Sequence, residues 1–256
     1  MSYLDVQKKG KGIYVSLNRP EKRNAFHPDM IKQLKQLFIE VDCDSDLQFV
    51  YLNGNGSSFC AGADLAWMKS MVNFSLEENI KDSEELFDMF AAIRNCGKLV
   101  LGHVHGHVMG GALGLVAACD IVTAEKSTKM AFSEVKLGLV PAVISPFVLQ
   151  KMNAQAAQRL MLTGEVFDAT MAMQSGLINF VGSETECHDY QATVIESILK
   201  TVPEAVRETK KLIQFFVQKD WGRIKKQTTT VIAERRVSPS GQEKLKAFLD
   251  REMKNG

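Results

Sequence analysis

One stretch of the chain, residues 105–141, constrains the fold more than any other. It follows the apolar run from Leu99 to Val104, which is typical of a buried strand. Gly110 and Gly111 then stand side by side, where a backbone without Cβ atoms can approach a ligand closely and turn into a helix. The small and apolar residues that follow predict a tightly packed helix whose free N–H groups point back at the glycine pair. This geometry favours the binding of an anion or of a developing oxyanion.

Glu134 stands further along the same stretch, in an apolar setting. Its neighbours in the sequence are Met130, Ala131, Phe132, Val135 and Leu137. Burial deprives a carboxylate of water, which raises its pKa and suits it to carry a proton. A salt-bridged or surface acid is the commoner role for a residue of this type, and the residues alone leave both roles open.

A second glycine-containing turn, residues 59–64 (FCAGAD), lies upstream. It leads into a helix that we expect to begin near Leu65, with Asp64 as its N-cap. Taken alone, this segment is a tight strand-to-helix turn. Beside Gly110 and Gly111 it gains a further meaning, because two such turns can each supply one backbone N–H to the same negatively charged oxygen.

Composition and charge exclude several classes of protein. The chain has 31 basic and 30 acidic side chains and a net charge of +1, so no global field attracts nucleic acid or an anionic membrane. Its five cysteines form no C-x-x-C pair, which argues against a disulfide framework and a zinc site. The first residues form no apolar signal core, and no apolar stretch is long enough to span a bilayer, so we expect neither a signal peptide nor a membrane-spanning helix. We therefore expect a cytoplasmic protein with no nucleic-acid or membrane partner.

Three histidines alternate at positions 103, 105 and 107. On a single strand, all three side chains would point to the same face, as in a metal site. No Asp or Glu flanks them at ligand spacing, and strand-end histidines with local hydrogen bonds are far commoner than metal ligands. We expect no metal.

The periodicity of the chain predicts strands early and helices late. A hairpin is expected from Tyr3 to Leu17, a helix that includes Pro28 in its first turn, and a strand from Phe49 to Leu52. A helix is also expected over residues 74–95. Later helices are expected over residues 154–162, 169–175, 186–200 and 203–216, and from about residue 240. This order indicates an α/β fold with a helical C-terminal region.

Four motifs carry a resemblance to a known family. They are NRPEKRNA (18–25), SSFCAGADLAWM (57–68), GHVMGGALGLVAACDI (106–121) and AFSEVKLGLVPAVISP (131–146). In this order they resemble the crotonase superfamily of acyl-CoA enzymes, the enoyl-CoA hydratases and isomerases, from about Leu4 to about Arg251. Together with RRVSPSGQEKLKAFL (235–249), they look most similar to bacterial enzymes of the methylglutaconyl-CoA hydratase type.

The resemblance implies an α/β fold with a crotonase-like ββα spiral core. That core, residues 1–195, would hold the acyl-CoA site, and residues 196–256 would form a helical trimerisation region. A homotrimer or a dimer of trimers is expected. Coenzyme A would be part of the substrate, with no other cofactor.

The resemblance also assigns roles to individual residues. The N–H groups of Ala63 and Gly111 would bind the thioester oxygen as it becomes an enolate. Glu134 falls on the second of two glutamates used by the family's hydratases, whereas the first position holds Gly114. Phe248 and Arg251 would reach the CoA of an adjacent subunit. The remaining substrate-binding positions, the first three of them near the phosphates, are Arg19, Lys22, Arg23, Ala25, Ala61, Asp64, Leu65, Trp67, Gly110 and Pro141.

Three functions remain open at this stage. The first is an enoyl-CoA hydratase that adds water across the 2,3 double bond, with methylglutaconyl-CoA as a candidate substrate. The second is a double-bond isomerase, because a single carboxylate also suits that reaction and Gly114 has no proton to give. The third is a non-catalytic protein that binds CoA esters. RNA binding is disfavoured by the net charge of +1.

Overall fold

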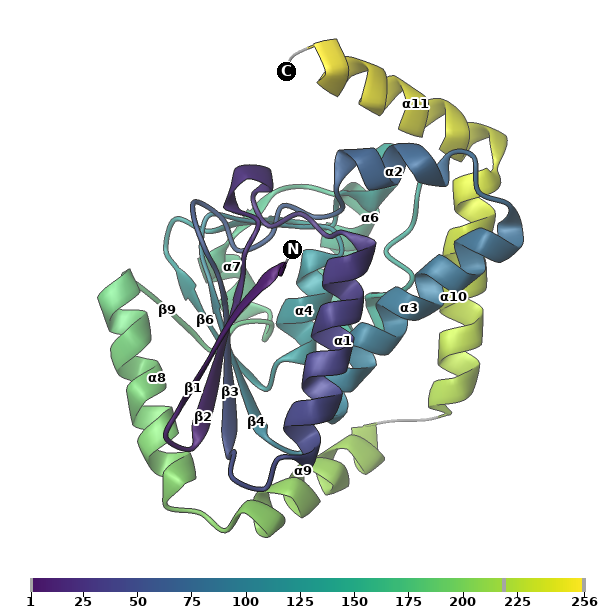
Figure 1. The fold of residues 1–256 in the computed structure, drawn as a ribbon. Coiled ribbons are helices and arrows are strands. Elements are labelled where there is room, and N and C mark those ends of the chain that lie inside the picture. The colour runs from purple at the N-terminus through teal and green to yellow at the C-terminus, as the bar shows by residue number, and fades with distance from the viewer. Residues whose placement is uncertain (1, 218–219, 255–256) are drawn as a thin grey trace.

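The computed structural model describes residues 2–217 and 220–254. A sheet of six strands runs through its centre, in the order β1-β2-β3-β4-β6-β9. Its members are β1 (Leu4–Lys9), β2 (Gly12–Leu17), β3 (Phe49–Gly54), β4 (Leu99–Val104), β6 (Ile121–Glu125) and β9 (Phe180–Gly182). The β1–β2 pair is an antiparallel hairpin and every later pairing is parallel, which is the arrangement expected of repeated strand–helix units (Figure 1).

A second, three-stranded sheet lies beside the first, in the order β5-β7-β8. Its strands are β5 (His107–Met109), β7 (Lys129–Ala131) and β8 (Phe167–Asp168). Gly106, with φ +59°, turns the chain from β4 into β5. The prediction that the three alternating histidines share one strand is therefore wrong: only His103 lies in β4, His105 follows it, and His107 begins a strand of the other sheet.

Helices cover both faces of the six-stranded sheet (Figure 1). The helices are α1 (Pro28–Cys43), α2 (Leu65–Met71), α3 (Leu76–Asn95), α4 (Ala112–Ala118), α5 (Ser145–Val148), α6 (Ala154–Thr163), α7 (Ala169–Gln174), α8 (Glu184–Leu199), α9 (Pro203–Val217), α10 (Trp221–Val237) and α11 (Pro239–Lys254). Short 3-10 helices span Pro20–Lys22 and Ser133–Leu137. In the described part of the chain, no helix has the length and apolar character needed to cross a membrane.

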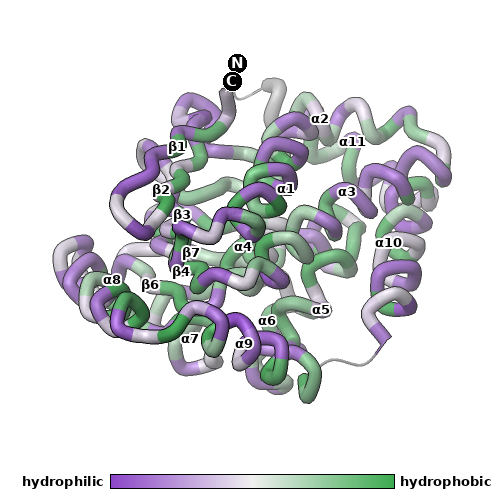
Figure 2. Tube along the Cα trace, turned by 60° about the horizontal axis from the view of Figure 1, so that its bottom comes forward, coloured by the Kyte–Doolittle hydropathy of each residue, from purple (hydrophilic) through white to green (hydrophobic). Residues whose placement is uncertain are grey.

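The two sheet faces carry different cores. Val50, Leu52 and Val100 belong to the main core, which also takes in side chains of α1, α3 and α4. Phe49, Tyr51 and Leu101, which alternate with them, form a smaller cluster under α8. Figure 2 shows the central strands and α4 largely hydrophobic, whereas α8 and α10 carry many hydrophilic residues.

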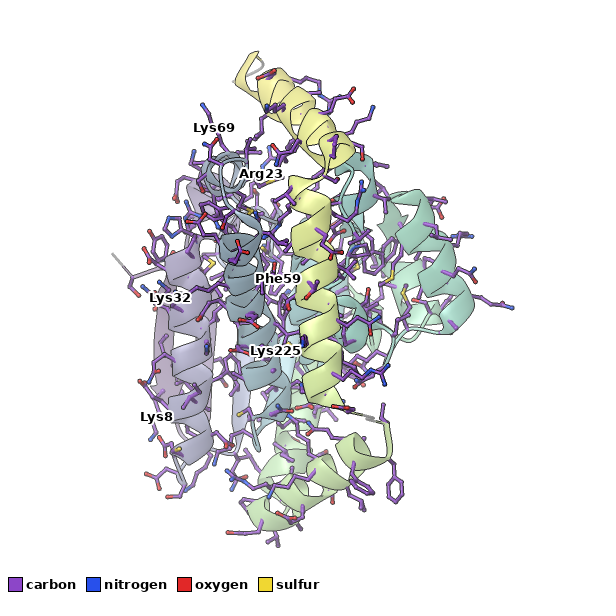
Figure 3. All side chains as sticks on the ribbon, turned by 90° about the vertical axis from the view of Figure 1, so that its right-hand side faces the viewer. Lys8, Arg23, Lys32, Phe59, Lys69 and Lys225 are labelled. Atoms are coloured by element: carbon purple, nitrogen blue, oxygen red, sulfur yellow. The ribbon has the colours of Figure 1, made fainter. Side chains whose placement is uncertain are left out.

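The C-terminal region packs on the core. The expected boundary at residues 195 and 196 falls inside α8, so the helices that follow the core begin with α9. Next, α10 lies along α3 with Ile232 in the main core, and α11 continues beyond it toward α2 (Figure 3). The elements predicted from the sequence agree with the structure within a few residues, whereas β6, β7, β8, α5 and α10 were not predicted.

Candidate active site

A cavity of about 880 Å³ opens between the loop after β2, the start of α2, the Gly110–Gly111 turn and the two last helices. Most of the residues predicted from the sequence line it. These are Arg19, Lys22, Arg23, Ala25, Ala61, Ala63, Asp64, Leu65, Trp67, Gly110, Gly111, Glu134, Pro141 and Phe248. Segments far apart in the chain therefore meet around one space, and the roles predicted for them there stay predictions.

The two glycine-containing turns are held side by side by backbone hydrogen bonds. Cys60 donates its N–H to the carbonyl of His107 (3.2 Å) and accepts one from Met109 (3.1 Å). Gly62 has φ +99°, and a Cβ built there would lie 3.0 Å from the Met109 carbonyl oxygen. Only glycine therefore lets the two turns approach this closely without strain.

This arrangement leaves two amides free at the cavity. Phe26 donates to Gly62 (2.7 Å) and accepts from Asp64 (2.9 Å), which turns the N–H of the intervening Ala63 away from that bridge. Gly111 begins α4 as its N-cap. Among the described residues, neither the N–H of Ala63 nor that of Gly111 has an acceptor. Two such donors at one cavity suit the stabilisation of an oxyanion.

Glu134 lies on the 3-10 helix Ser133–Leu137, beside the Gly110 turn. Its Oε2 is buried and has no hydrogen-bond partner among the described residues, and a Cβ built on Gly110 would lie 3.4 Å from its Oε1. Burial raises the pKa of the carboxyl group to about 7. The sequence left open whether this acid is salt-bridged or on the surface, and the structure places it in the cavity wall, where it can both accept and release a proton near neutral pH.

Gly114, which the sequence placed among the catalytic positions, does not line the cavity. A Cβ built there would lie 2.6 Å from Cζ of Phe90 and 2.7 Å from Cγ2 of Ile144. Real Cβ atoms do not approach so closely, so the two apolar side chains occupy the space that a glutamate would need. Among the described residues of the cavity wall, the acidic side chains are Asp64 and Glu134. Asp64 is engaged as the N-cap of α2, so Glu134 is the acid that remains for the reaction.

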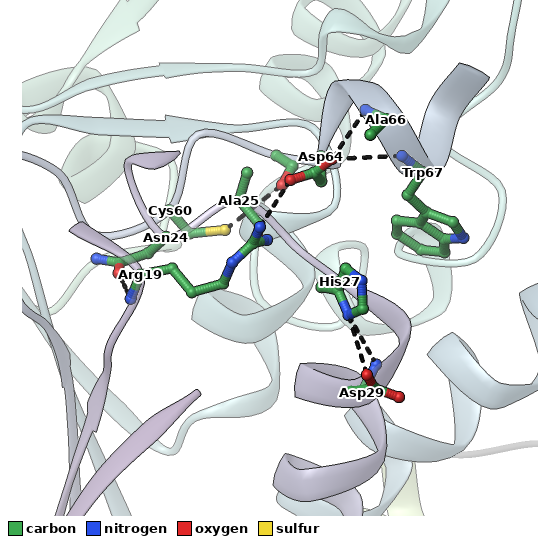
Figure 4. Close-up of polar contacts among 10 residues, drawn as sticks. Arg19, Asn24, Ala25, His27, Asp29, Cys60, Asp64, Ala66 and Trp67 are labelled. Atoms are coloured by element: carbon green, nitrogen blue, oxygen red, sulfur yellow. Dashed lines mark hydrogen bonds and ion pairs between the residues drawn. The ribbon is translucent and has the colours of Figure 1, made fainter. Parts of the chain in front are cut away.

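Arg19 contacts a carboxylate. Its guanidinium donates to Oδ2 of Asp64 (2.8 Å) and to the carbonyl of Ala25 (2.7 Å) (Figure 4). Burial opposes ionisation of Asp64, but the hydrogen bonds from Arg19 and from the first N–H groups of α2 outweigh it and keep the pKa below its ordinary value. Asp64 is the N-cap of α2, as predicted. In this structure Arg19 therefore positions the loop, and its contact with phosphates stays a prediction.

Lys22 and Arg23 are exposed at the mouth of the cavity. The loop that presents them is fixed by the buried Asn24, whose Nδ2 donates to the carbonyls of Asn55 (2.8 Å) and Ser58 (2.9 Å). Two cations on a rigid loop are well placed for the phosphates of a CoA ester.

We expect the double variant Lys22→Gln/Arg23→Gln to raise KM for a CoA ester about tenfold, with kcat unchanged, because each lost cation removes about 0.7 kcal/mol of charge attraction. Steady-state kinetics at two salt concentrations measures this, and added salt should shrink the difference between variant and parent. Lys32→Gln is the matched control, since Lys32 is exposed on α1 away from the cavity. An equal rise in KM in the control would argue against a local role of the loop.

A charged network that the sequence did not indicate lies at another part of the cavity wall. Trp67 donates its indole N–H to Oδ1 of Asp82 (3.2 Å), and Arg236 donates to Oδ2 of the same carboxylate (2.9 Å). Burial raises the pKa of Asp82, an effect that Arg236 and Trp67 oppose. The Nε of Arg236 is buried without a partner among the described residues, although Arg236 lines the cavity. One donor of Arg236 is therefore left without an acceptor among the described residues.

The two C-terminal positions differ from each other. Phe248 lines the cavity of its own chain, where it packs with Met68, Leu245 and Leu249. Arg251 is exposed and is absent from the described cavity wall. Contact of either residue with the CoA of an adjacent subunit stays a prediction.

The sequence matches the model of the family described as enoyl-CoA hydratase/isomerase over residues 8–254. The chain belongs to the enoyl-CoA hydratase/isomerase family. This family member is 30% identical over 217 residues to the short-chain-enoyl-CoA hydratase of Clostridium acetobutylicum, with 84% of this chain and 82% of that protein covered.

Solved structures agree with this assignment. The enoyl-CoA hydratase of Shewanella pealeana superposes with a TM-score of 0.82 at 34% identity, covering 98% of this chain and 94% of that one. An enoyl-CoA hydratase of Mycobacterium avium superposes with a TM-score of 0.87 at 29% identity, covering 98% and 97%. The predicted crotonase fold is confirmed, and the chain is an enzyme of a family whose hydratases are lyases.

Proposed function

We propose that this enoyl-CoA hydratase/isomerase family member is a hydratase that adds water across the 2,3 double bond of an enoyl-CoA thioester. The proposal depends on one observation: a single buried carboxyl group, Glu134, with a pKa raised to about 7, lies beside the turn that presents the Gly111 amide.

The chemistry follows from these groups. The thioester oxygen accepts hydrogen bonds from the N–H groups of Ala63 and Gly111, so that negative charge can move onto it. Ionised Glu134 takes a proton from water as the water oxygen bonds to the β carbon and the double-bond electrons move toward the thioester. The resulting enolate then takes a proton at the α carbon from the same carboxyl group. The net change is the addition of one water, and the carboxylate is restored. A pKa near 7 suits both directions of this transfer.

The alternative within the family is a double-bond isomerase. A lone carboxylate can also remove a proton at one carbon and return it at another, and the apolar contacts of Phe90 and Ile144 at Gly114 remove the second carboxylate position. This second candidate rests on that observation. A non-catalytic CoA-ester-binding protein is a third candidate. Binding alone, however, does not require an unpartnered buried acid beside two free amides.

One experiment separates the three. The purified protein is incubated with crotonyl-, 3-methylcrotonyl-, 3-methylglutaconyl- and 3-enoyl-CoA esters, and the products are resolved by mass. A gain of one water with the 2-enoyl esters supports the hydratase. An unchanged mass with a shifted double bond supports the isomerase and contradicts the hydratase. Tight binding of every ester without turnover supports the non-catalytic binding protein and contradicts both enzymes.

For the acyl group, we propose a tail that ends in an oxygen acceptor, as in 3-methylglutaconyl-CoA. Arg236 lines the cavity and its buried Nε has no acceptor among the described residues, which supports this, because a small shift of the side chain would let a substrate oxygen satisfy that donor. The nearby Asp82 has a raised pKa, so it is better able than an ordinary Asp to take up a proton beside a substrate carboxylate.

We expect the double variant Arg236→Gln/Asp82→Asn to lower kcat/KM for 3-methylglutaconyl-CoA by at least tenfold more than for crotonyl-CoA. Both charges are removed together, since leaving one buried charge uncompensated would cost about 3–5 kcal/mol of stability. The ratio of the two kcat/KM values in one preparation cancels any loss of folded enzyme. A ratio equal to that of the parent would contradict the assignment of Arg236.

For assembly, we propose a homotrimer or a dimer of trimers. Its support is the apolar surface of α9, where four large side chains are more than half exposed: Leu212, Ile213, Phe215 and Phe216. Exposed apolar groups this concentrated mark an interaction surface. Sedimentation at micromolar concentration should give three or six chains in the parent, and Phe215→Ser/Phe216→Ser should shift it to smaller species. A monomeric parent would refute the proposal.

A further inference from the structure

A cluster of metal-ligating side chains lies outside the active site. His103 lies at the end of β4 and His105 directly follows that strand, and Glu125 is the last residue of the neighbouring strand β6. In the register His103 faces Thr123, so Glu125 stands across from the position of His105. None of the three lines the active-site cavity, and they share the sheet face of Leu101, which α8 covers. We call these three residues the histidine cluster.

The geometry of the histidine cluster fits a cation. One ligand atom from each residue lies within 4.8 Å of the other two. His103 Nε2 is 3.7 Å from Oε1 of Glu125, and the His103 and His105 rings stack at 6.1 Å. Around a tetrahedral zinc with bonds of about 2.1 Å, ligand atoms are about 3.4 Å apart. His105 and Glu125 are only partly buried, so small rotations of their side chains close the remaining gap.

The second nitrogen of each histidine is already engaged. Nδ1 of His103 is 3.1 Å from Oγ1 of Thr123, and Nε2 of His105 is 2.9 Å from the carbonyl oxygen of Gly56. Metal-ligating histidines usually show this pattern, because a hydrogen bond at one nitrogen fixes the ring and leaves the other nitrogen's lone pair for the metal. The His105 bond requires its proton on Nε2, which makes Nδ1 the ligand atom.

The facing atoms at the site also suit a cation. When the proton of His103 lies on Nδ1 toward Thr123, the lone pair of Nε2 faces the Glu125 carboxylate at 3.7 Å. A divalent cation between these two atoms would be bound by both.

We propose that His103, His105 and Glu125 bind one divalent transition-metal ion, with zinc as the best match to two imidazoles and a carboxylate. The fourth position is open to water or to His188 of α8, whose ring lies 5.2 Å from that of His103. The metal would join β4 to β6 at the far side of the sheet from the glycine turns. Its role is therefore structural, and it takes no part in the reaction at Glu134.

The test uses full-length protein stripped with EDTA. Zn²⁺ is titrated calorimetrically, Co²⁺ is followed by its visible absorption, and Tm is measured with and without Zn²⁺. We expect one ion per chain and a rise in Tm. His105→Ala and Glu125→Gln should each weaken Zn²⁺ binding at least tenfold and reduce the rise in Tm. His107→Ala is the matched control and should bind as the parent does, since His107 lies in the other sheet near Ser58.

Two results would overturn the proposal: no saturable Zn²⁺ binding by the parent, or equal affinity in the parent and in both ligand variants. The Tm of each stripped variant shows that it is folded, so a loss of binding is not mistaken for unfolding. His188→Ala decides the fourth position. A further loss of affinity assigns it to His188, and an unchanged affinity assigns it to water. Because the readout is metal binding, failure here leaves the hydratase proposal intact.

Discussion

Glu134→Gln is expected to lower kcat by at least 100-fold, and by as much as about 10,000-fold, which is the usual range for losing a general acid–base. The glutamine keeps the shape of the side chain but neither takes a proton from water nor returns one. Steady-state turnover of a 2-enoyl-CoA measures the loss, and binding of the ester by calorimetry should be unchanged. Turnover equal to that of the parent would remove Glu134 from the reaction.

The same substitution should stabilise the protein at alkaline pH. The folded state raises the pKa of this carboxyl from 4.5 to about 7, so the folded protein binds more protons than the unfolded chain between these values. The parent's free energy of unfolding therefore falls as pH rises through this window. At about 1.4 kcal/mol per pH unit the interval amounts to about 3 kcal/mol.

Urea unfolding at pH 4 and pH 8 measures this difference. Parent and Glu134→Gln should have similar stabilities at pH 4, and the variant should be more stable by about 3 kcal/mol at pH 8. Glu165→Gln is the matched control, because Glu165 forms a surface ion pair with Arg159 and should show no such gain. A variant that is less stable than the parent at pH 8 would contradict the burial of an unpaired carboxyl group.

Gly111→Pro is expected to lower kcat by about 100- to 1,000-fold, the usual effect of removing one oxyanion donor. Gly111 has φ −52°, which proline can adopt, and its N–H has no acceptor in the described structure. The substitution therefore removes a donor to the substrate without breaking a hydrogen bond of the fold.

Gly111→Ala is the control, because it adds a Cβ and keeps the N–H. That Cβ would lie 3.3 Å from Cε2 of Phe26, a tight contact that a small movement of the ring relieves. The alanine variant should keep most of the parent's kcat, so the ratio of the two variants isolates the amide. Equal kcat values in the two variants would mean that the Gly111 N–H does not stabilise the transition state.

Local patterns predicted the first four strands, β1 to β4, most helices and the groups that we place at the centre of the site. Paired glycines, a capping Asp64 and an acid among apolar residues each reflect a requirement of the nearby backbone, and a single sequence carries that information. The fold brings Ala63, Gly111 and Glu134 to one cavity as expected.

Contacts between distant segments were not predictable in this way. The pairing of Arg19 with Asp64 depends on how two loops meet, and Glu125 reaches the histidines only through the β4–β6 register. Helix α10 is rich in Thr and charged residues, so its sequence pattern is weak, and it is stabilised by packing along α3 and by the bond of Arg236 to Asp82. Arg236 was missed for the same reason.

The central claim is that one desolvated carboxyl group, at position 134, carries the proton. Infrared difference spectra of the parent against Glu134→Gln, recorded across pH, follow that carboxyl group directly. We predict a protonated carboxyl band that disappears with a midpoint near pH 7. A midpoint at the ordinary value of about 4.5 for a solvated glutamate would contradict the claim.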